Sequence, residues 1–352
     1  MLQPWETRTA RRLERRRPEL DVLAYQHASS MAQGGRHRGV TSSGVGFDEA
    51  SGRHPRWFLR DREGQPVTER GYPWLWMADV GDPGYQRRWA RNVSRLLRRG
   101  PWDGVFMDGV NATAKYQTDV ASLARYPDDA SLQAAMGSML ARVSPAIRAR
   151  GHLAIANFGA WVEHPDVVQS WLAQVDGGLD EMFAKWSRVP GHGYRDPASW
   201  RVNVAEVQQT HQAGRIFLGV TQAARDDVQA RRFGWATVLL GASGPAGYLA
   251  APDEYEPAPP ALPDGGRAPG TPIGPAVIPP DGVAYRVFSA GLVLVNPELE
   301  PRTVALPVPM SGSGVRRATT ATMAPHSALV LRPHAPALAL WPPAFQPPVS
   351  AR

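Results

Sequence analysis

The sequence predicts an α/β fold, a (β/α)8 TIM barrel followed by a small C-terminal antiparallel β-sandwich domain. Strand-like and helix-like segments alternate from the start of the chain to about residue 250, as eight strand–helix units would. The strand segments are short, near-continuous apolar runs, which are typical of parallel strands buried on both faces. After residue 280 the segments instead alternate apolar with polar or turn residues, as antiparallel strands do.

The same patterns divide the 352 residues into four segments. Residues 1–250 form the predicted barrel, and residues 251–280, dense in Pro, Ala and Gly, form a linker or an irregular wrap. Residues 281–333 form the β-sandwich domain, and residues 334–352 form a Pro- and Ala-rich tail. A doubly wound open sheet is the alternative to the barrel, but no Gly-rich dinucleotide-binding turn follows an early strand.

Each element of the barrel is predicted from its local pattern. Apolar runs predict strands over residues 2–5, 21–25, 73–80, 102–107, 152–158, 177–183, 215–221 and 245–250. Apolar residues at helical spacing predict helices over residues 7–17, 82–99, 128–150, 166–175, 197–213 and 226–240. The C-terminal domain has predicted strands over residues 283–288, 291–296, 302–306 and 328–331. The long connection between the second and third strands, roughly residues 30–72, predicts a functional lid or wall.

Composition excludes several classes of protein. The formal charge is +7, but the arginines are spread out, and no aromatic-interleaved basic stripe is visible, so we expect no nucleic-acid partner. A genome-level preference for Arg over Lys explains the charge better. Cys is absent, which excludes disulfides and thiolate metal sites. The sequence contains no run of 18 apolar residues, so we expect no membrane span. The N-terminus lacks a signal-peptide pattern, and we expect a monomer.

The most informative stretch is residues 101–117. A short apolar run, Val105 to Met107, ends on the carboxylate of Asp108, and a Gly and a polar loop with Asn111 and Lys115 follow. In parallel α/β folds the chemistry collects where strands end and loops begin. Asp108 is therefore a candidate catalytic acid, although it could instead cap the following turn.

Other strand ends supply further candidate site residues. They are acids, amides, aromatic rings and the only two lysines of the chain, each of which follows a strand end that carries an acid. The catalytic candidates are Asp108 and Glu181, and the substrate-binding candidates are Tyr25, Asp79, Asn111, Lys115, Asn157, Lys185, Trp76, Trp186, Gln222 and Tyr248.

This set of residue types suits a carbohydrate. Carboxylates perform acid–base chemistry, amides bond hydroxyl groups, and flat aromatic rings stack on the C–H faces of sugars. No His-x-His or His-Glu-x-x-His pattern is present, so we expect neither a metal nor another cofactor. Simpler roles stay open: Asp79 could cap a loop, His27 could be a packed histidine, and tryptophans are often core residues. Asp180 alternates with Glu181 along its strand and is expected to be structural.

Several of these segments resemble the glycoside-hydrolase-like TIM-barrel family and, more distantly, the endo-α-1,4-polygalactosaminidases. The resemblance rests on Tyr25-Gln26-His27, on Asp61 after Trp57-Phe58-Leu59-Arg60, on Asp79 to Tyr85, and above all on Asp103-Gly104-Val105-Phe106-Met107-Asp108. It covers roughly residues 2–250. The segment Leu294 to Pro297 resembles the β-sandwich that often follows such barrels.

The resemblance implies a retaining glycosidase without a cofactor, acting on an α-linked oligo- or polysaccharide. Asp108 would be the nucleophile and Glu181 the general acid/base, as implied by their positions after the fourth and sixth strands. We expect that burial raises the pKa of Glu181. We also expect that the positive charge of Lys115 keeps Asp108 ionised. The resemblance also suggests secretion or a place in the cell envelope. The alternative is a non-catalytic carbohydrate-binding barrel that holds a glycan without cutting it.

Overall fold

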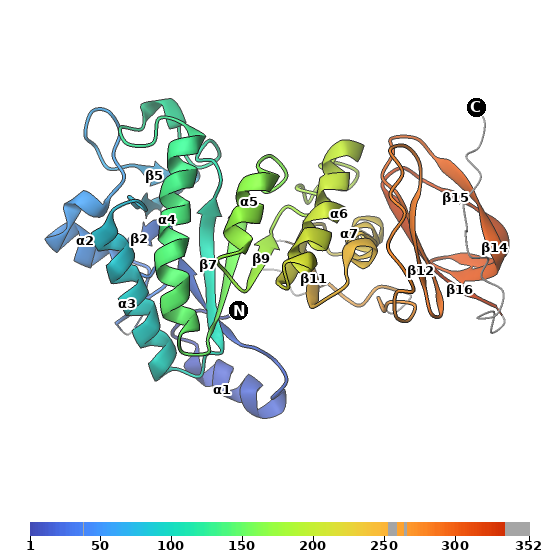
Figure 1. Cartoon of the computed structure of the whole chain (residues 1–352), viewed down its shortest axis with the longest axis horizontal. Helices are drawn as coiled ribbons and strands as arrows, with labels where there is room; N and C mark the ends of the chain where they lie inside the picture. Colours follow the sequence, from blue (N-terminus) through green and yellow to red (C-terminus); the bar gives the residue numbers. More distant parts are fainter. Residues whose placement is uncertain (38, 253–258, 264–265, 335–352) are drawn as a thin grey trace. The chain divides into compact units, whose positions relative to one another are not determined.

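A computed structural model describes the chain apart from residues 38, 253–258, 264–265 and 335–352 (Figure 1). The predicted tail after residue 334 and part of the predicted 251–280 wrap therefore lie outside the described residues. The chain forms two compact units, Met1–Leu179 and Asp180–Arg352. The domain boundaries expected from the sequence stay a prediction.

The first unit contains both α/β elements and small antiparallel sheets. Its helices are α1 (Thr7–Arg16), α2 (Phe47–Arg53), η1 (Pro55–Trp57), α3 (Pro83–Arg99), η2 (Val120–Ser122), α4 (Asp129–Arg148) and α5 (Pro165–Leu172). Its strands are β1 (Leu23–His27), β2 (Ser30–Ala32), β3 (Arg36–His37), β4 (Val40–Thr41), β5 (Thr68–Glu69), β6 (Tyr72–Met77), β7 (Gly104–Asn111), β8 (Leu153–Gly159) and, ending at the first residue of the second unit, β9 (Gly177–Asp180).

Parallel strands form the centre of the first unit, in the order β1-β7-β8-β9. The side chains of Val105, Phe106 and Met107 on β7 are buried, as the apolar run predicted. Helices α3 and α4 run beside each other along this sheet (Figure 1). The start of α3 follows its predicted capping pattern, because Asp82 accepts hydrogen bonds from the backbone N–H groups of Gly84 and Tyr85 at 2.7 and 3.0 Å.

The segment predicted as the third barrel strand has a different partner from the one expected. It forms β6, which pairs antiparallel with β2 and β5 in a separate three-stranded sheet. The reason is the preceding connection: residues 30–72 supply both partner strands, and Gly71, with φ of +83°, allows the tight turn between β5 and β6. The expected first strand at residues 2–5 is reduced to one parallel bridge between Leu2 and Ala24.

The second unit begins with further α/β elements and continues into an antiparallel sheet. Its elements are α6 (Pro197–Gln212), β10 (Ile216–Gln222), α7 (Val228–Gly241), β11 (Ala246–Ala251), β12 (Ala284–Phe288), β13 (Gly291–Asn296), β14 (Arg302–Gly312), β15 (Val315–Met323) and β16 (Ser327–Pro333). Strands β10 and β11 pair in parallel.

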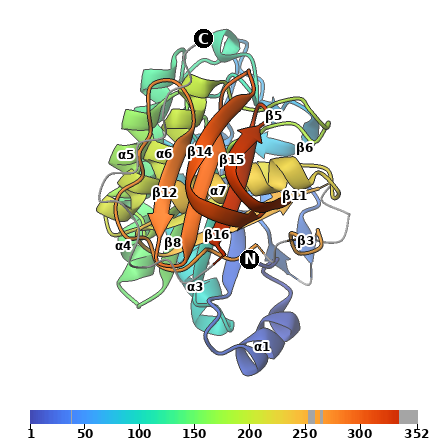
Figure 2. The ribbon, with the colours of Figure 1, turned by 90° about the vertical axis from the view of Figure 1, so that its right-hand side faces the viewer.

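The C-terminal strands form one antiparallel sheet in the order β12-β13-β16-β14-β15, and Figure 2 shows β14 and β15 running side by side. Its buried face includes Leu292, Leu294 and Met310. The predicted α/β class with parallel strands and a C-terminal antiparallel domain is therefore confirmed. Strand β15 was missed, because Arg and Thr occupy most of its positions and give it little apolar alternation.

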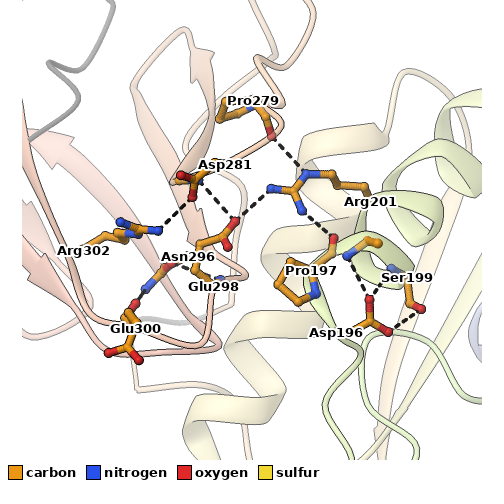
Figure 3. A network of polar contacts seen from close by, with 12 residues as sticks. Asp196, Pro197, Ser199, Arg201, Pro279, Asp281, Asn296, Glu298, Glu300 and Arg302 are labelled. Carbon is orange, nitrogen blue, oxygen red and sulfur yellow. Dashed lines mark hydrogen bonds and ion pairs between the residues drawn. The ribbon is translucent and has the colours of Figure 1, made fainter. Parts of the chain in front are cut away.

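Arginines join the α/β elements of the second unit to its C-terminal segment. Arg201 of α6 donates hydrogen bonds to the carbonyl oxygen of Pro279 at 3.0 Å and to the Glu298 carboxylate at 2.8 Å (Figure 3). Arg286 of β12 donates to the carbonyl oxygens of Leu239, Leu240 and Ala242 at the end of α7. Among the described residues, no helix is both long and apolar enough to cross a membrane.

Candidate functional site

Three neighbouring parallel strands place polar side chains around the carboxylate of Asp108. Tyr25 of β1 donates its hydroxyl to Oδ2 at 2.5 Å, and Asn157 of β8 donates its amide to Oδ1 at 2.9 Å. The backbone N–H of Gly109 also donates to Oδ1, at 2.8 Å. In the β1–β7 register His27 lies directly opposite Asp108, so the end of β1 lies next to this carboxylate. The structure thus joins Asp108, Tyr25 and Asn157 in one cluster.

The surroundings of Asp108 favour its ionised form. Burial raises the pKa of this carboxyl, but the positive charge of His27 and the hydrogen bonds from Tyr25, Asn157 and the Gly109 N–H lower it. The lowering contributions outweigh burial, so the pKa of Asp108 lies below its ordinary value. An ionised carboxylate that is held this firmly can attack an electron-poor carbon or stabilise a developing positive charge.

His27 and Glu69 form a second layer of charge beside Asp108. The His27 side chain is buried, and its Nε2 lies 3.5 Å from Oε1 of Glu69 on β5. Ser30 donates its hydroxyl to the same Glu69 oxygen. Nδ1 of His27 has no hydrogen-bond partner among the described residues. His27 was expected to be a packed histidine. Glu69 was not among the predicted site residues, because no local pattern marks it and the folding of residues 30–72 brings it here.

A glycine makes the close approach of His27 to β7 possible. Gly109 has φ of +75°, and a Cβ at this position would lie 2.4 Å from Cε1 of His27 and 2.6 Å from Oγ of Ser29. Its carbonyl oxygen accepts a hydrogen bond from Ser29 at 2.7 Å. The pairing of β7 with β8 changes register between Met107 and Val110, so the strand bends just where Asp108 projects.

Lys115 has a partner other than the expected one. Its ammonium group pairs with Glu163, and Tyr116 donates its hydroxyl to the same carboxylate. We expected Lys115 to keep Asp108 ionised, but this expectation was wrong: the side chain whose electrostatic interaction lowers the pKa of Asp108 is His27. Asn111 lies at the end of β7, where Gly159 leaves room for it, because a Cβ there would be 1.9 Å from Oδ1 of Asn111.

Asp79 and Trp76, also candidates from the sequence, lie in contacts of their own. Asp79 is buried, and its two carboxylate oxygens accept hydrogen bonds from Arg125 and Tyr126. Trp76 donates its indole N–H to Gln33 at 2.9 Å and packs against Phe47 and Phe58, with ring centroids 5.7 and 6.0 Å away. No hydrogen bond or ion pair joins either residue directly to Asp108 within the described part of the first unit.

Glu181 lies at the start of the second unit, directly after β9. Its side chain is exposed, which contradicts the burial expected of it. The residue before it, Asp180, is buried and accepts hydrogen bonds from the Met182 N–H at 2.8 Å and from Asn203 at 3.2 Å. Asp180 therefore fixes the turn that carries Glu181, which agrees with the structural role expected of it.

The other candidates of the second unit include a buried lysine. Lys185 is fully buried, and its ammonium group donates to the carbonyl oxygens of Ser187, Val189 and Gln222. Gln222 is buried and donates its amide to the Glu181 carbonyl oxygen at 3.0 Å. Tyr248 donates to the Arg231 carbonyl oxygen at 3.0 Å.

Trp186 is the most exposed aromatic candidate of the second unit, with 56% of its surface accessible. The roles predicted for these residues stay predictions. In the described part of the chain, no group of three or more His, Asp or Glu side chains is placed to hold a metal ion.

Comparison with known proteins gives a family match. The model of the hypothetical glycosyl hydrolase family 15 matches residues 14–292, which is more than half of the chain. No curated protein matches this chain.

Several solved structures are similar to this chain. The α-amylase from Malbranchea cinnamomea is similar at a TM-score of 0.49 and 11% identity, over 95% of this chain and 78% of that one. For the glycoside hydrolase domain of PelA from Pseudomonas aeruginosa, the TM-score is 0.43 and the identity 14%, over 70% of this chain and 83% of that one.

Proposed function

Because the chain belongs to the hypothetical glycosyl hydrolase family 15, we propose that it cleaves an α-linked oligo- or polysaccharide with retention of configuration. A retaining mechanism needs a carboxylate nucleophile and a second carboxyl group that first acts as acid and then as base. Asp108 is the proposed nucleophile and Glu181 the proposed acid/base. The α-linkage and the retaining course rest on the resemblance of the strand-end acids to those of barrels that act on α-glycosides.

One observation carries the proposal: Asp108 is held ionised and fixed in place by groups from three strands. Two side-chain donors and one backbone donor bond its oxygens, and the electrostatic interaction with His27 also lowers the pKa of Asp108. A nucleophile must be ionised and must keep its orientation when the sugar arrives. An acid that merely capped a turn would not need donors from both neighbouring strands.

In the proposed reaction, Glu181 protonates the leaving oxygen while Asp108 attacks the anomeric carbon and the glycosidic bond breaks. The glycosyl–Asp108 ester is then hydrolysed by a water molecule that transfers a proton to Glu181, which restores both groups. Asn157 and Tyr25 hold the nucleophile, and hydroxyl groups of the sugar are proposed to bind Asn111, Asp79, Gln222 and the aromatic candidates. The test is the release of reducing ends from a panel of polysaccharides.

Asp108→Asn should lower turnover by about 10³-fold or more, because it removes the attacking group. Asp21→Asn, which changes an exposed carboxyl group just before β1, is the matched control and should keep full activity. Wild-type turnover by Asp108→Asn would overturn the assignment. Glycan binding with no release of reducing ends by the unmodified protein would favour a non-catalytic carbohydrate-binding barrel.

The role of Glu181 has its own test. Glu181→Gln should lose most activity on natural glycans but keep much of its kcat/KM for glycosides with a good leaving group, because formation of the glycosyl–enzyme from these needs no protonation. Equal losses on both kinds of substrate would contradict the acid/base assignment while leaving that of Asp108 intact.

A further inference from the structure

The first unit contains a cavity of about 640 Å³ that the proposed reaction does not use. Its volume falls within the range of small-molecule sites, roughly 300–1,000 Å³. Gln26 of β1 lines it, whereas the neighbouring residues Tyr25 and His27 face Asp108. Successive side chains of a strand point to opposite faces, so this cavity and the Asp108 cluster lie on opposite faces of β1.

One wall of the cavity is a basic face of α3. Arg88, Arg95 and Arg99 line it, and their spacing of seven and four residues places them on one side of the helix. Arg88 pairs with Glu49 of α2 at 2.6 Å. Arg95 and Arg99 are exposed and have no ion-pair partner among the described residues. Two guanidinium groups therefore remain available at this wall.

Another part of the lining is a glycine-rich loop that is fixed against α3. Asn92 donates its amide to the carbonyl oxygen of Gly44 at 3.0 Å. A Cβ on Gly44 would lie 2.1 Å from Nε1 of Trp89, so only glycine allows this close packing. The loop is thus held against α3, and this part of the cavity lining is built into the packing.

An aromatic side chain forms part of the cavity wall just after α3. Trp102 lines the cavity and is only 4% exposed. Gly100 also lines the cavity, and a Cβ there would lie 2.1 Å from the indole nitrogen of Trp102, so the ring packs directly on the glycine backbone. Because this packing covers the nitrogen, Trp102 gives the cavity an apolar wall, and the donors available to a ligand are the arginines.

We infer that this cavity binds a small ligand that carries a phosphate or sulfate group. The lining has three arginines and two acids, Asp48 and Glu49, and Arg88 pairs with Glu49, so positive charge is in excess. Arg95 and Arg99 lie one turn apart on the same side of α3, so both guanidinium groups can donate to one bound group. Such donors suit a tetrahedral anion, which presents oxygens in all directions, whereas a planar carboxylate is satisfied by one guanidinium group.

Isothermal titration of the whole chain at low salt tests this inference, with inorganic phosphate and inorganic sulfate as separate probes. We expect saturable binding of at least one of them, and binding at least tenfold weaker in the double variant Arg95→Ala/Arg99→Ala. The control is Arg91→Ala/Arg98→Ala, which removes the same charge from exposed positions of α3 outside the cavity and should bind normally. Equal loss in both variants, or no saturable binding, would overturn the inference.

Two further arms define the ligand and the site. Acetate that binds as tightly as phosphate would contradict the preference for a tetrahedral anion. The Arg95→Ala/Arg99→Ala variant should still hydrolyse glycans, so a failure of the glycosidase proposal and a failure of this inference give different results.

Discussion

Two neutral side chains, Tyr25 and Asn157, donate hydrogen bonds to the carboxylate of Asp108, one to each oxygen. Hydrogen bonds to a charged acceptor contribute about 1.5–3 kcal/mol each, and here they favour the ionised form. Because the folded-state pKa of Asp108 is depressed, its ionisation stabilises the fold above the ordinary pKa of an aspartate. This stability is lost as the pH falls through the lower folded-state value.

Tyr25→Phe should therefore raise the pKa of Asp108. The acid limb of the kcat/KM profile reports the free nucleophile, so it should move to higher pH, while the basic limb stays in place. Tyr72→Phe, which removes a hydroxyl from an exposed tyrosine, is the control and should leave the profile unchanged. An acid limb that does not move in Tyr25→Phe would show that this hydrogen bond does not tune the group that limits the rate.

The bend of β7 at Gly109 is the element on which the candidate site depends. Its positive φ and its contact with His27 both require glycine. A left-handed conformation costs an L-residue roughly 1–2 kcal/mol, and a forced contact in a packed region costs about 1–3 kcal/mol more. The bend therefore depends on glycine at this position.

Gly109→Ala should destabilise the protein by the sum of these two effects, and Gly151→Ala by the first alone. Gly151 has φ of +77° but nothing within 4 Å of its missing Cβ, so it separates backbone strain from the clash with His27. Denaturant unfolding measures the difference. Equal losses of unfolding free energy in the two variants would mean that His27 moves aside at no cost.

Elements with a strong local pattern could be predicted from the sequence, and long-range partners could not. The apolar run before Asp108 and the Asp82-Pro83 start of α3 are local signals, and both elements form. The partner of Lys115 is Glu163, 48 positions later, and the partner of His27 is Glu69, in a segment expected to be only a loop or lid. Such pairings depend on how distant segments fold together, which no spacing rule encodes.

At the scale of the whole molecule, each compact unit has its own stabilising contacts. In the second unit, Arg286 is 6% exposed and satisfies three carbonyl oxygens at the end of α7, while its Nε donates to the Gly274 carbonyl oxygen at 2.9 Å. These contacts take up carbonyl groups that a helix end leaves unpaired. They join α7 to the antiparallel sheet within that unit. The Arg201 contacts drawn in Figure 3 join α6 to Pro279 and Glu298 of the same unit.

Arg286→Met should destabilise the protein by about 3–5 kcal/mol, because it leaves several buried carbonyl groups without donors. Arg316→Met on β15 removes an exposed arginine and should change the unfolding free energy by less than about 0.5 kcal/mol. Thermal or denaturant unfolding compares them. Similar stabilities of the two variants would show that water replaces Arg286 at the end of α7.

The most direct test of the central claim is to trap the proposed covalent intermediate. The wild-type protein is incubated with activated fluorosugars of α configuration, which form the glycosyl–enzyme quickly and release it slowly, and its peptides are then weighed by mass spectrometry. The account predicts one added glycosyl group on the peptide that contains Asp108, and none in Asp108→Asn. Turnover of these sugars with no adduct, or an adduct on another carboxylate, would contradict it.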